Sequence, residues 1–245
     1  MALEEQLLVA RASGRPCAVP PGDQPGSEQA AYAVQHAISR TLGPIGGWKV
    51  GATGPEAAPN AAPLPASVLL PSGTVLGPDF SDRLIESEIA FRLAEDLPPR
   101  AEAYGRADIL AAIDTCLPVI EIVQWRILEG SAASPQLKLA DHLGHGALIL
   151  GERVADWPGI DFPHLRVRQE IEGGDITLRT GNPAGDMIRL IQWLANEGAH
   201  WAGGLKAGQI VTCGSWTGML PAAPGAEVRT SFVGFAPVSV RFHAG

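Results

Sequence analysis

The sequence predicts an α+β fold in which a helical N-terminal segment precedes a β-rich body. The 245 residues include 29 glycines and 21 prolines, a content that favours many turns and short strands over a helical bundle. Apolar residues recur at helical spacing between residues 27 and 42, whereas short apolar runs, several of them alternating, dominate after about residue 80. The length suits one domain with a substantial core.

The first quarter of the chain is expected to be mainly helical. A stripe of Leu3, Leu7 and Leu8 precedes a Pro- and Gly-rich break over residues 14–26. Ser27 is a suitable N-cap for the next helix, which Gly43 and Pro44 should end. Its apolar positions lie three and four residues apart: Ala31, Val34, Ile38 and Leu42.

A short strand is expected at residues 46–51, where glycines bracket Trp48 and Lys49 in G-G-W-K-V-G. Residues 55–78 are rich in Pro and Ala and poor in charge, so we expect them to be irregular. We divide the chain into residues 1–78, which hold the helical segment, the lysine strand and the proline-rich loop, and residues 79–245, the β-rich metal-binding body. The two are expected to form one structural unit.

Alternation over residues 85–93 predicts a strand with Glu86 and Glu88 on one face. A helix is expected next, with apolar residues at 109, 110, 113 and 117 and an end at Pro118, before a buried β-branched strand at 119–123. Asn182 is expected to cap a later helix that begins with Pro183 and ends at Gly198. Gly173-Gly174 indicates a hairpin. Further strands are expected at 147–150, 165–171, 176–179, 209–213, 228–233 and 238–242.

Charge and composition exclude several classes of protein. Eighteen basic and 26 acidic residues give a net charge of −8, which argues against nucleic-acid binding. No apolar stretch approaches the roughly 18–20 residues of a membrane span. The first residues, M-A-L-E-E, lack the pattern of a secretion signal. The three cysteines are odd in number and widely spaced, and Cys116 and Cys213 lie in apolar runs typical of the core, so we expect a cytoplasmic protein without a disulfide framework.

Three carboxylates stand out. Glu86 and Glu88 project from the same strand face, and Glu121 interrupts the apolar run V-I-E-I-V. A buried carboxylate is costly unless it is paired or binds a cation. The alternatives are a solvated face for Glu86 and Glu88 and an ion pair with an arginine such as Arg126 for Glu121. A hard divalent cation would offset all three charges, and all-oxygen ligation favours Mg²⁺ or Mn²⁺.

In this chain the run I-E-S-E-I-A-F is followed by L-P-V-I-E-I-V, and this arrangement resembles the metal-ligand pattern of the fumarylacetoacetate hydrolase superfamily. The chain is most similar to the branch of 2-keto-4-pentenoate hydratases and 4-oxalocrotonate decarboxylases. The likeness covers most of residues 27–242. It extends to G-W-K-V-G at 47–51, L-A-D-H at 139–142, G-N-P at 181–183, W-L-A-N at 193–196 and L-K-A-G-Q-I-V-T-C-G-S-W-T-G at 205–218.

The resemblance implies a mixed β-roll with flanking helices, assembled into homo-oligomers. It also implies that Glu86, Glu88 and Glu121 bind the metal and that Lys49 is the acid/base or substrate-orienting residue; the alternative is a surface lysine. A cation beside Lys49 would lower its pKa. The substrates implied are small 2-oxo acids or their dienols, which chelate the metal.

Further candidates have structural alternatives. Ser215 and Thr217 are candidate donors to a substrate carboxylate, or turn-capping hydroxyls. Asn182 is a candidate substrate contact at a helix N-terminus, or an ordinary cap. Asp141 is a candidate catalytic residue that orients a lysine or water, or a loop acid. Arg126 is a candidate substrate-binding residue. His142 and His145 form a weak candidate for a second metal pair.

The sequence departs from the branch in three places. Gln124 and Trp125 stand where the branch has Asp and Ser, before the retained Arg126. The stretch A-D-H-L-G-H-G replaces Ala-Asp-Asn-Ala-Ser, and residues 55–78 lack an acidic, tyrosine-containing loop. Trp125, Trp216 and the neutral loop suggest a larger or more apolar substrate. Because these branch residues are missing, one alternative is that the protein is a non-catalytic homologue that binds metal and ligand, or the partner subunit of an active relative.

The leading hypothesis is a Mg²⁺- or Mn²⁺-dependent lyase that hydrates a 2-hydroxy-2,4-dienoate to a 4-hydroxy-2-oxo acid. A divalent cation stabilises the dienolate charge that such chemistry develops. Decarboxylation or C–C hydrolysis of an acylpyruvate-like 2-oxo acid is the alternative within the enzyme class.

Overall fold

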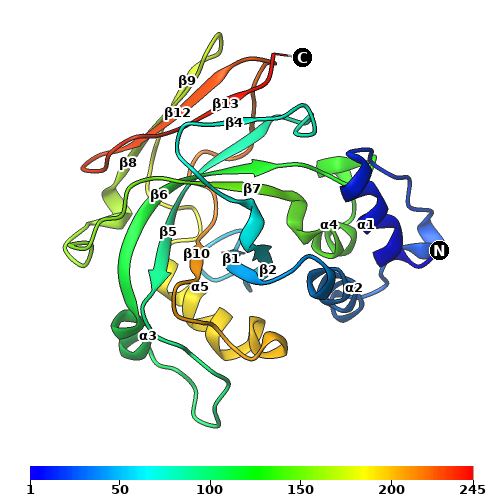
Figure 1. Ribbon diagram of the computed structural model, residues 1–245. Coiled ribbons are helices and arrows are strands. Elements are labelled where there is room, and N and C mark those ends of the chain that lie inside the picture. The colour runs from blue at the N-terminus through cyan, green and yellow to red at the C-terminus, as the bar shows by residue number, and fades with distance from the viewer. Residues whose placement is uncertain (245) are drawn as a thin grey trace.

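The structure, a computed structural model, describes residues 1–244 and contains two mixed β-sheets (Figure 1). The larger sheet has the strand order β2-β1-β10-β5-β6-β7-β3, with β11 paired to the first residues of β5, and the smaller has the order β4-β13-β12-β8-β9. The strands are β1 Ile45–Gly51, β2 Asn60–Pro65, β3 Leu69–Pro71, β4 Thr74–Leu76, β5 Leu84–Leu93, β6 Ile113–Val123, β7 His145–Leu150, β8 Arg166–Ile171, β9 Ile176–Thr180, β10 Ile210–Thr212, β11 Leu220–Pro221, β12 Glu227–Phe232 and β13 Val238–Phe242.

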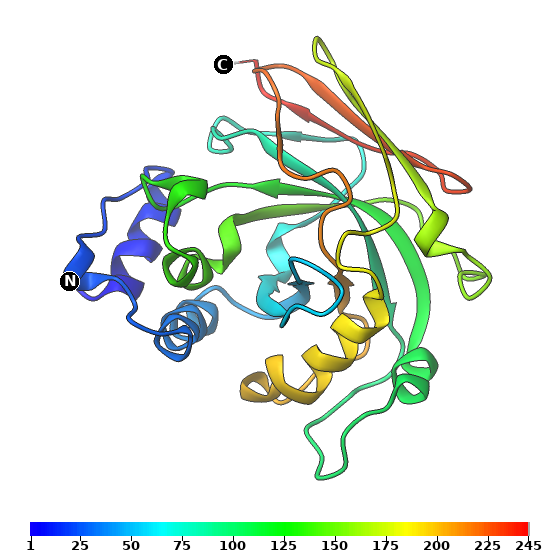
Figure 2. The ribbon, with the colours of Figure 1, turned by 180° about the vertical axis from the view of Figure 1, so that it is seen from behind.

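Helices lie at the periphery of the sheets. Helices α1, α2 and α4 gather at one end of the molecule, and α3 and α5 lie at another, as the two opposite views show (Figures 1 and 2). The helices are α1 Leu3–Ser13, α2 Glu28–Thr41, α3 Arg106–Ala112, α4 Pro135–Ala140 and α5 Met187–Trp193, which continues as a π-helical turn over Leu194–Gly198. Short 3₁₀ turns occur at Pro21–Asp23, Ala66–Val68, Gly130–Ala132, His142–Gly144, Phe162–His164 and His200–Ala202.

Helix α2 joins the N-terminal segment to the larger sheet. Ser27 caps it as predicted, because its hydroxyl accepts a hydrogen bond from the Ala30 amide. On the buried face the Gln35 amide donates to the carbonyls of Ala61 in β2, at 3.2 Å, and Leu139 in α4, at 2.8 Å.

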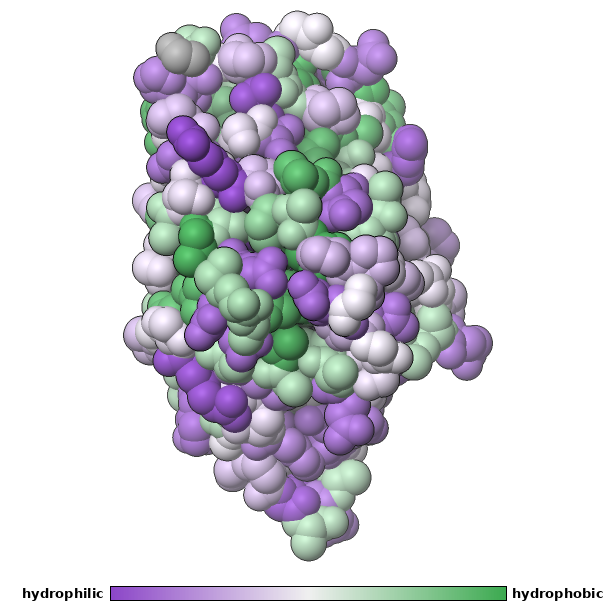
Figure 3. All heavy atoms as spheres, turned by 90° about the vertical axis from the view of Figure 1, so that its right-hand side faces the viewer, coloured by the Kyte–Doolittle hydropathy of each residue, from purple (hydrophilic) through white to green (hydrophobic). Residues whose placement is uncertain are grey.

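The side of the molecule seen in Figure 3 presents hydrophobic side chains in its middle part among hydrophilic ones.

Strands β5 and β6 form the centre of the larger sheet and pair antiparallel along nearly their whole length. Ile89, Phe91, Val119 and Ile120 are fully buried, since the sheet is covered on both faces and apolar β-branched and aromatic residues fit such a surface. The predicted α+β class is confirmed. The division at residues 78/79 stays a prediction.

Two predicted segments were wrong. The helix expected to continue through Ile113 and Leu117 ends at Ala112, and both residues lie in β6 together with Pro118. A spacing of four residues keeps side chains on one face of a strand as well as on one face of a helix, so the pattern did not distinguish the two. Residues 55–78, expected to be irregular, contain β2, β3 and β4. All three lie at sheet edges, where proline is tolerated.

Asn182 is not the predicted helix cap. Helix α5 begins at Met187, and its cap is Asp186, whose carboxylate accepts from the Ile188 amide. The Asn182 side chain accepts from the Ala184 amide in a local turn instead. The hairpin predicted at Gly173-Gly174 is present between β8 and β9, and Gly173 adopts a φ of +76° that favours glycine. Within residues 1–244, no helix has the length and apolarity needed to cross a membrane.

Candidate metal centre

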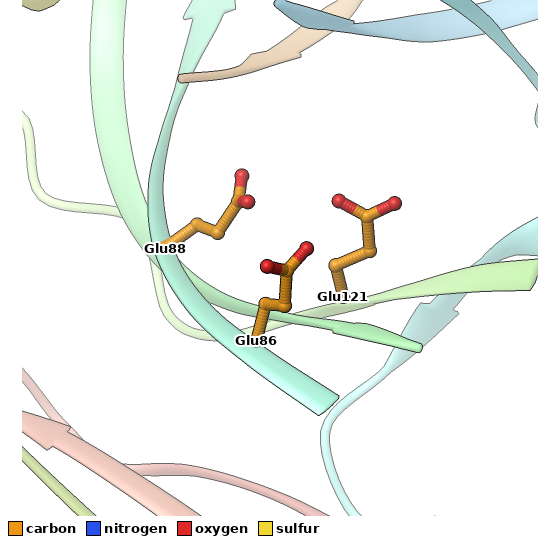
Figure 4. A group of neighbouring side chains, drawn as sticks. All are labelled: Glu86, Glu88 and Glu121. Atoms are coloured by element: carbon orange, nitrogen blue, oxygen red, sulfur yellow. The ribbon is translucent and has the colours of Figure 1, made fainter. Parts of the chain in front are cut away.

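Three carboxylates converge on the larger sheet. Glu86, Glu88 and Glu121 each offer an oxygen, and these oxygens lie within 4.8 Å of one another. Glu86 and Glu88 project from the same side of β5, and Glu121 points toward them from β6 (Figure 4). The strand register explains the convergence, because Glu86 pairs directly with Glu121 across the antiparallel ladder. Residues paired in this way have Cβ atoms about 4.5–5.5 Å apart.

Burial makes this cluster electrostatically unfavourable by itself. Glu121 is 0% exposed and Glu88 is 2% exposed, and like charges directly opposite in a sheet are destabilising. Burial and the charge of Glu121 raise the pKa of Glu86 to about 6. Burial and the neighbouring carboxylates raise the pKa of Glu88 to about 8. Burial also opposes ionisation of Glu121, but the charges and hydrogen bonds of Lys49 and His145 together outweigh it and lower that pKa to about 2.

Lys49 approaches the carboxylates from β1. Its Nζ donates a short hydrogen bond to Oε1 of Glu121 and a longer one, 3.4 Å, to the Leu143 carbonyl. Burial favours the neutral amine, but the charges of Glu121, Glu86 and Glu88 prevail and raise the pKa of Lys49. The lowering expected from the sequence depends on the charge of a cation beside the lysine.

Two neighbours of the carboxylates were not assigned their present roles by the sequence. The Thr212 hydroxyl, in β10, donates to Oε2 of Glu88, and Nδ1 of His145 lies 3.2 Å from Oε1 of Glu121. Thr212 lies in the run I-V-T-C-G, part of the stretch that carries the family resemblance. That resemblance was the sequence feature that could have indicated a role for this residue. His142, the other member of the weak metal pair, contacts the Ser39 hydroxyl instead, at 2.9 Å, so the two histidines face different partners.

A cavity of about 270 Å³ opens beside the carboxylates. Its lining is small and neutral apart from Lys49, Glu86 and Glu88, and includes Asn60, Leu143 and Ser215. Ser215 lowers the pKa of Glu86 against the larger effect of burial, and its hydroxyl oxygen is buried without a hydrogen-bond partner among the described residues. Ser215 is therefore a candidate contact for a ligand in this cavity.

Thr217 and Asn182 hold the loop that carries Ser215. The Thr217 hydroxyl accepts from the Ser87 amide, at 3.1 Å, and donates to Gln169, at 3.0 Å. The Asn182 amide donates to the carbonyls of Cys213 and Gly214. Both side chains thus fix the backbone beside the carboxylates, and neither lines the 270 Å³ cavity.

Arg126 and Asp141 form a buried ion pair with each other. Nε of Arg126 lies 2.5 Å from Oδ1 of Asp141, and the Arg126 amide donates to Oδ2 at 2.9 Å. The alternative pairing of Arg126 with Glu121 is absent among the described ion pairs, where Glu121 pairs with Lys49. Neither residue lines the cavity beside the carboxylates. Burial raises the pKa of Asp141, against the opposing charge of Arg126.

The two tryptophans expected to shape the substrate pocket lie elsewhere. Trp125 packs against Gly130 and Gly144, and Trp216 lines a separate cavity of about 820 Å³ together with Phe91 and Trp157. That cavity is larger and more apolar, but it contains none of the three carboxylates. Side chains alternate across a strand, so Phe91 projects from the opposite face of β5 to Glu86 and Glu88.

The residues present fit a divalent cation. Three buried carboxylates face one another, and Oε2 of Glu121 is buried without a hydrogen-bond partner among the described residues. An unpaired buried carboxylate oxygen is costly, and a cation would satisfy it. Oxygen ligands without histidine or cysteine are the set that Mg²⁺, Mn²⁺ and Ca²⁺ prefer.

The chain is similar in sequence to known hydratases. The chain is 28% identical over 158 residues to 2-hydroxyhexa-2,4-dienoate hydratase of Comamonas testosteroni, a match that spans 64% of this chain and 59% of that relative. It is 29% identical to 2-keto-4-pentenoate hydratase 2 of Dechloromonas aromatica (strain RCB), with 96% of this chain and 94% of that relative covered. No family model matches the chain.

The structural likeness covers nearly the whole chain. The solved structure of 4-oxalocrotonate decarboxylase from Pseudomonas putida G7, complexed with magnesium and adipate, superposes with a TM-score of 0.86 at 25% identity, over 98% of this chain and 96% of that one. A fumarylacetoacetate hydrolase family protein from Yersinia pestis CO92 shares the fold at a TM-score of 0.60 and 19% identity, over 81% and 93% of the two chains. The fold is thus that of the fumarylacetoacetate hydrolases. In sequence the chain is similar to 2-hydroxy-2,4-dienoate and 2-keto-4-pentenoate hydratases, and in structure it is similar to 4-oxalocrotonate decarboxylase.

Proposed function

We propose that the protein is a Mg²⁺- or Mn²⁺-dependent hydro-lyase that adds water to a 2-hydroxy-2,4-dienoate and produces a 4-hydroxy-2-oxo acid. The observation that carries this proposal is the convergence of Glu86, Glu88 and Glu121, with Lys49 hydrogen-bonded to one of them, beside a small cavity. The hydratases among the relatives support the reaction class.

In this proposal the three glutamates would bind the cation and Lys49 would act as the general acid and base. A cation held by these carboxylates would act as a Lewis acid that offsets the negative charge of a dienolate. Hydration requires protonation of the terminal carbon, loss of the 2-hydroxyl proton, bonding of water oxygen to C4 and delivery of a proton to C3. Nζ of Lys49 lines the cavity and, unlike Glu86 and Glu88, is not assigned to the cation, so it would donate and accept these protons. The Ser215 hydroxyl, which also lines the cavity, would orient substrate.

The lining of the cavity favours a substrate with a neutral tail. Lys49 is the cation among the lining residues, and its charge is already paired with Glu121. A second substrate carboxylate would therefore be desolvated beside Glu86 and Glu88 without an unpaired cation, which is unfavourable. This supports hydration of a monoacid such as 2-hydroxypenta-2,4-dienoate.

Steady-state turnover of 2-hydroxypenta-2,4-dienoate, followed by the loss of its ultraviolet absorbance, tests the proposal. With Mg²⁺ or Mn²⁺ the wild type is expected to turn over, and chelation should abolish activity. Lys49→Ala should lower kcat by about 10²–10⁴-fold, the usual contribution of a general acid or base. Lys206→Ala is the matched control, because Lys206 forms a surface pair with Asp96. Tight metal binding without turnover of any 2-oxo acid would contradict the proposal and indicate a non-catalytic homologue.

Decarboxylation is the second candidate, because the likeness to 4-oxalocrotonate decarboxylase extends over nearly the whole chain. Its diagnostic result is release of CO₂ from a 4-oxalocrotonate-type diacid that exceeds hydration of the monoacid. C–C hydrolysis of an acylpyruvate would instead release two carboxylic acids.

We also propose that the protein acts in the cytoplasm and as a homo-oligomer. All three cysteines are free, which suits a reducing compartment. Ile176, Leu178 and Val233 expose apolar surface, at or beside the strands of the smaller sheet. Light scattering coupled to gel filtration measures the oligomeric state, and a monomer would contradict this part of the proposal.

A further inference from the structure

We propose that His145 is a positioning residue for the metal centre: its Nδ1–H holds Oε1 of Glu121 so that Oε2 stays directed at the cation. This inference rests on the proposed role of the three carboxylates as metal ligands, and it concerns a residue that is not itself a ligand. His145 is 1% exposed and lies at the first position of β7, next to β6, which carries Glu121.

Both side-chain hydrogen bonds of Glu121 are made by the same one of its two carboxylate oxygens. Oε1 accepts from Nζ of Lys49 and from Nδ1 of His145, whereas Oε2 has no partner among the described residues although it is buried. Because Oε1 already accepts a hydrogen bond from the Lys49 ammonium, this oxygen faces His145 as an acceptor too. Nδ1 of His145 therefore carries the hydrogen. Two donors on one oxygen fix the carboxylate and leave the other oxygen for a cation.

Hydrogen bonds from Arg126 fix the backbone that carries the His145 imidazole. The His145 carbonyl accepts from Nη1 of Arg126 at 2.6 Å, and Nη2 of Arg126 donates to the Asp141 carbonyl at 2.6 Å. The same guanidinium forms the buried ion pair with Asp141. Arg126 and Asp141, which the sequence suggested as site residues, thus support the metal centre by fixing the residue that contacts Glu121.

The chain enters His145 through an unusual turn. His142, Leu143 and Gly144 have φ values of +53°, +54° and +74°. The left-handed region is unfavourable for residues other than glycine, and such strain persists where the surrounding structure requires it. This turn brings two groups to the same place: the Leu143 carbonyl, which accepts from Lys49, and the His145 ring, which contacts Glu121.

Packing alone does not explain a histidine at this position. Nε2 of His145 is buried and has no hydrogen-bond partner in residues 1–244, so the ring leaves one polar atom unsatisfied at a cost in stability. An apolar side chain would avoid that cost. Among residues 1–244, the ring makes a hydrogen bond only with Glu121. Hydrogen bonds from groups behind a metal ligand orient the ligand and increase metal affinity.

Metal affinity of the full-length, metal-free protein tests the inference. Binding of Mg²⁺ and of Mn²⁺ alone is measured by calorimetry, with thermal unfolding recorded for each variant. His145→Ala should weaken binding by about 10–100-fold, the usual effect of losing such a partner. His145→Asn, whose amide lies near the Nδ1 position, should recover most of the affinity, whereas His145→Gln, whose amide lies near the Nε2 position, should not.

His142→Ala is the matched control, since His142 is equally buried three residues earlier but contacts Ser39; it should leave metal affinity unchanged. Wild-type affinity in folded His145→Ala or in His145→Gln would overturn the inference, as would equal weakening in His142→Ala. If His145→Ala does not fold, equal affinities of the Asn and Gln variants would overturn it. Absence of metal binding by the wild type would instead refute the proposed function.

Discussion

Glu121 illustrates how much of this site depends on single atoms. Its two oxygens have different environments, with two donors on Oε1 and none on Oε2. By contrast, Asp141, which the sequence also suggested for catalysis, has its charge neutralised by Arg126 and lies outside the cavity. Residue type and local motif are therefore insufficient to separate a chemical role from a structural one, because the distinction lies in the partners of each oxygen.

The ion pair between Arg126 and Asp141 yields a stability prediction. Asp141→Asn removes the partner of a buried guanidinium, and we expect the free energy of unfolding to fall by about 3–5 kcal/mol. Urea denaturation measures the change. Asp96→Asn is the control, because its surface pair with Lys206 should contribute about 0–1 kcal/mol. A variant at position 141 with wild-type stability but no turnover would instead assign Asp141 to catalysis.

Strand pairing determines which side chains meet. The alternation of β5 and the apolar run of β6 could be predicted from the sequence, and their register places Glu86 opposite Glu121. Strand β10 lies between β1 and β5, which brings Lys49 and Thr212 to the same face. Neither the strand order nor the register is encoded in any local pattern, so the meeting of Lys49 with Glu121 rested on the family resemblance.

The parts that sequence analysis missed have identifiable physical reasons. The edge strands β2 and β3 contain prolines, which ordinarily indicate loops but are compatible with strands that lack a second neighbour. Asn182 followed by Pro183 suits a turn and a helix start equally well, and the cap is Asp186. His145 lies in a glycine-rich stretch whose left-handed turn depends on contacts with Trp125 and Lys49, which are distant in sequence.

The turn before β7 gives a prediction at the level of one element. A Cβ on Gly144 would lie 2.9 Å from the Trp125 ring, in addition to having an unfavourable φ of +74°. Gly144→Ala should therefore destabilise the protein by about 1–3 kcal/mol through overpacking, beyond the backbone cost. Gly73→Ala isolates that backbone cost, since Gly73 has a φ of +84° with no atom within 4 Å of the added carbon. If thermal unfolding showed equal losses of stability in Gly144→Ala and Gly73→Ala, the predicted clash with Trp125 would be contradicted.

At the scale of the whole molecule, histidines that folding withdraws partly or wholly from water link stability to pH. Burial, and then the charge of Arg40, lowers the pKa of His36 to about 4. Burial, and then the charges of Arg11 and Arg126, holds the pKa of His142 well below its ordinary value. Both residues bind protons more strongly in the unfolded chain, where the pKa is about 6.5. Their contribution to stability is therefore present above pH 6.5 and is lost as the pH falls toward 4.

Melting temperatures recorded from pH 8 to pH 4.5 check this sign. His36→Phe retains a ring to stack on Trp201, from which the His36 ring is 3.9 Å away, but cannot bind a proton. Its melting temperature should fall less steeply below pH 6.5 than that of the wild type. His164→Phe, at an exposed position, provides the comparison. If the melting temperature of His36→Phe fell with pH as steeply as that of the wild type, or more steeply, His36 would not contribute to the pH dependence of stability.

The position of β10 in the larger sheet has a consequence for biosynthesis. Strand β1 emerges early from the ribosome, but its parallel partner β10, which also separates it from β5, comes only at residues 210–212. Until then the nascent chain presents unpaired edges on β1 and β5, the kind of surface that aggregates or recruits chaperones. Translation must therefore pass residue 212 before Lys49 can reach Glu121 in its final setting. Products truncated before that residue should accumulate as insoluble material rather than as partial enzymes.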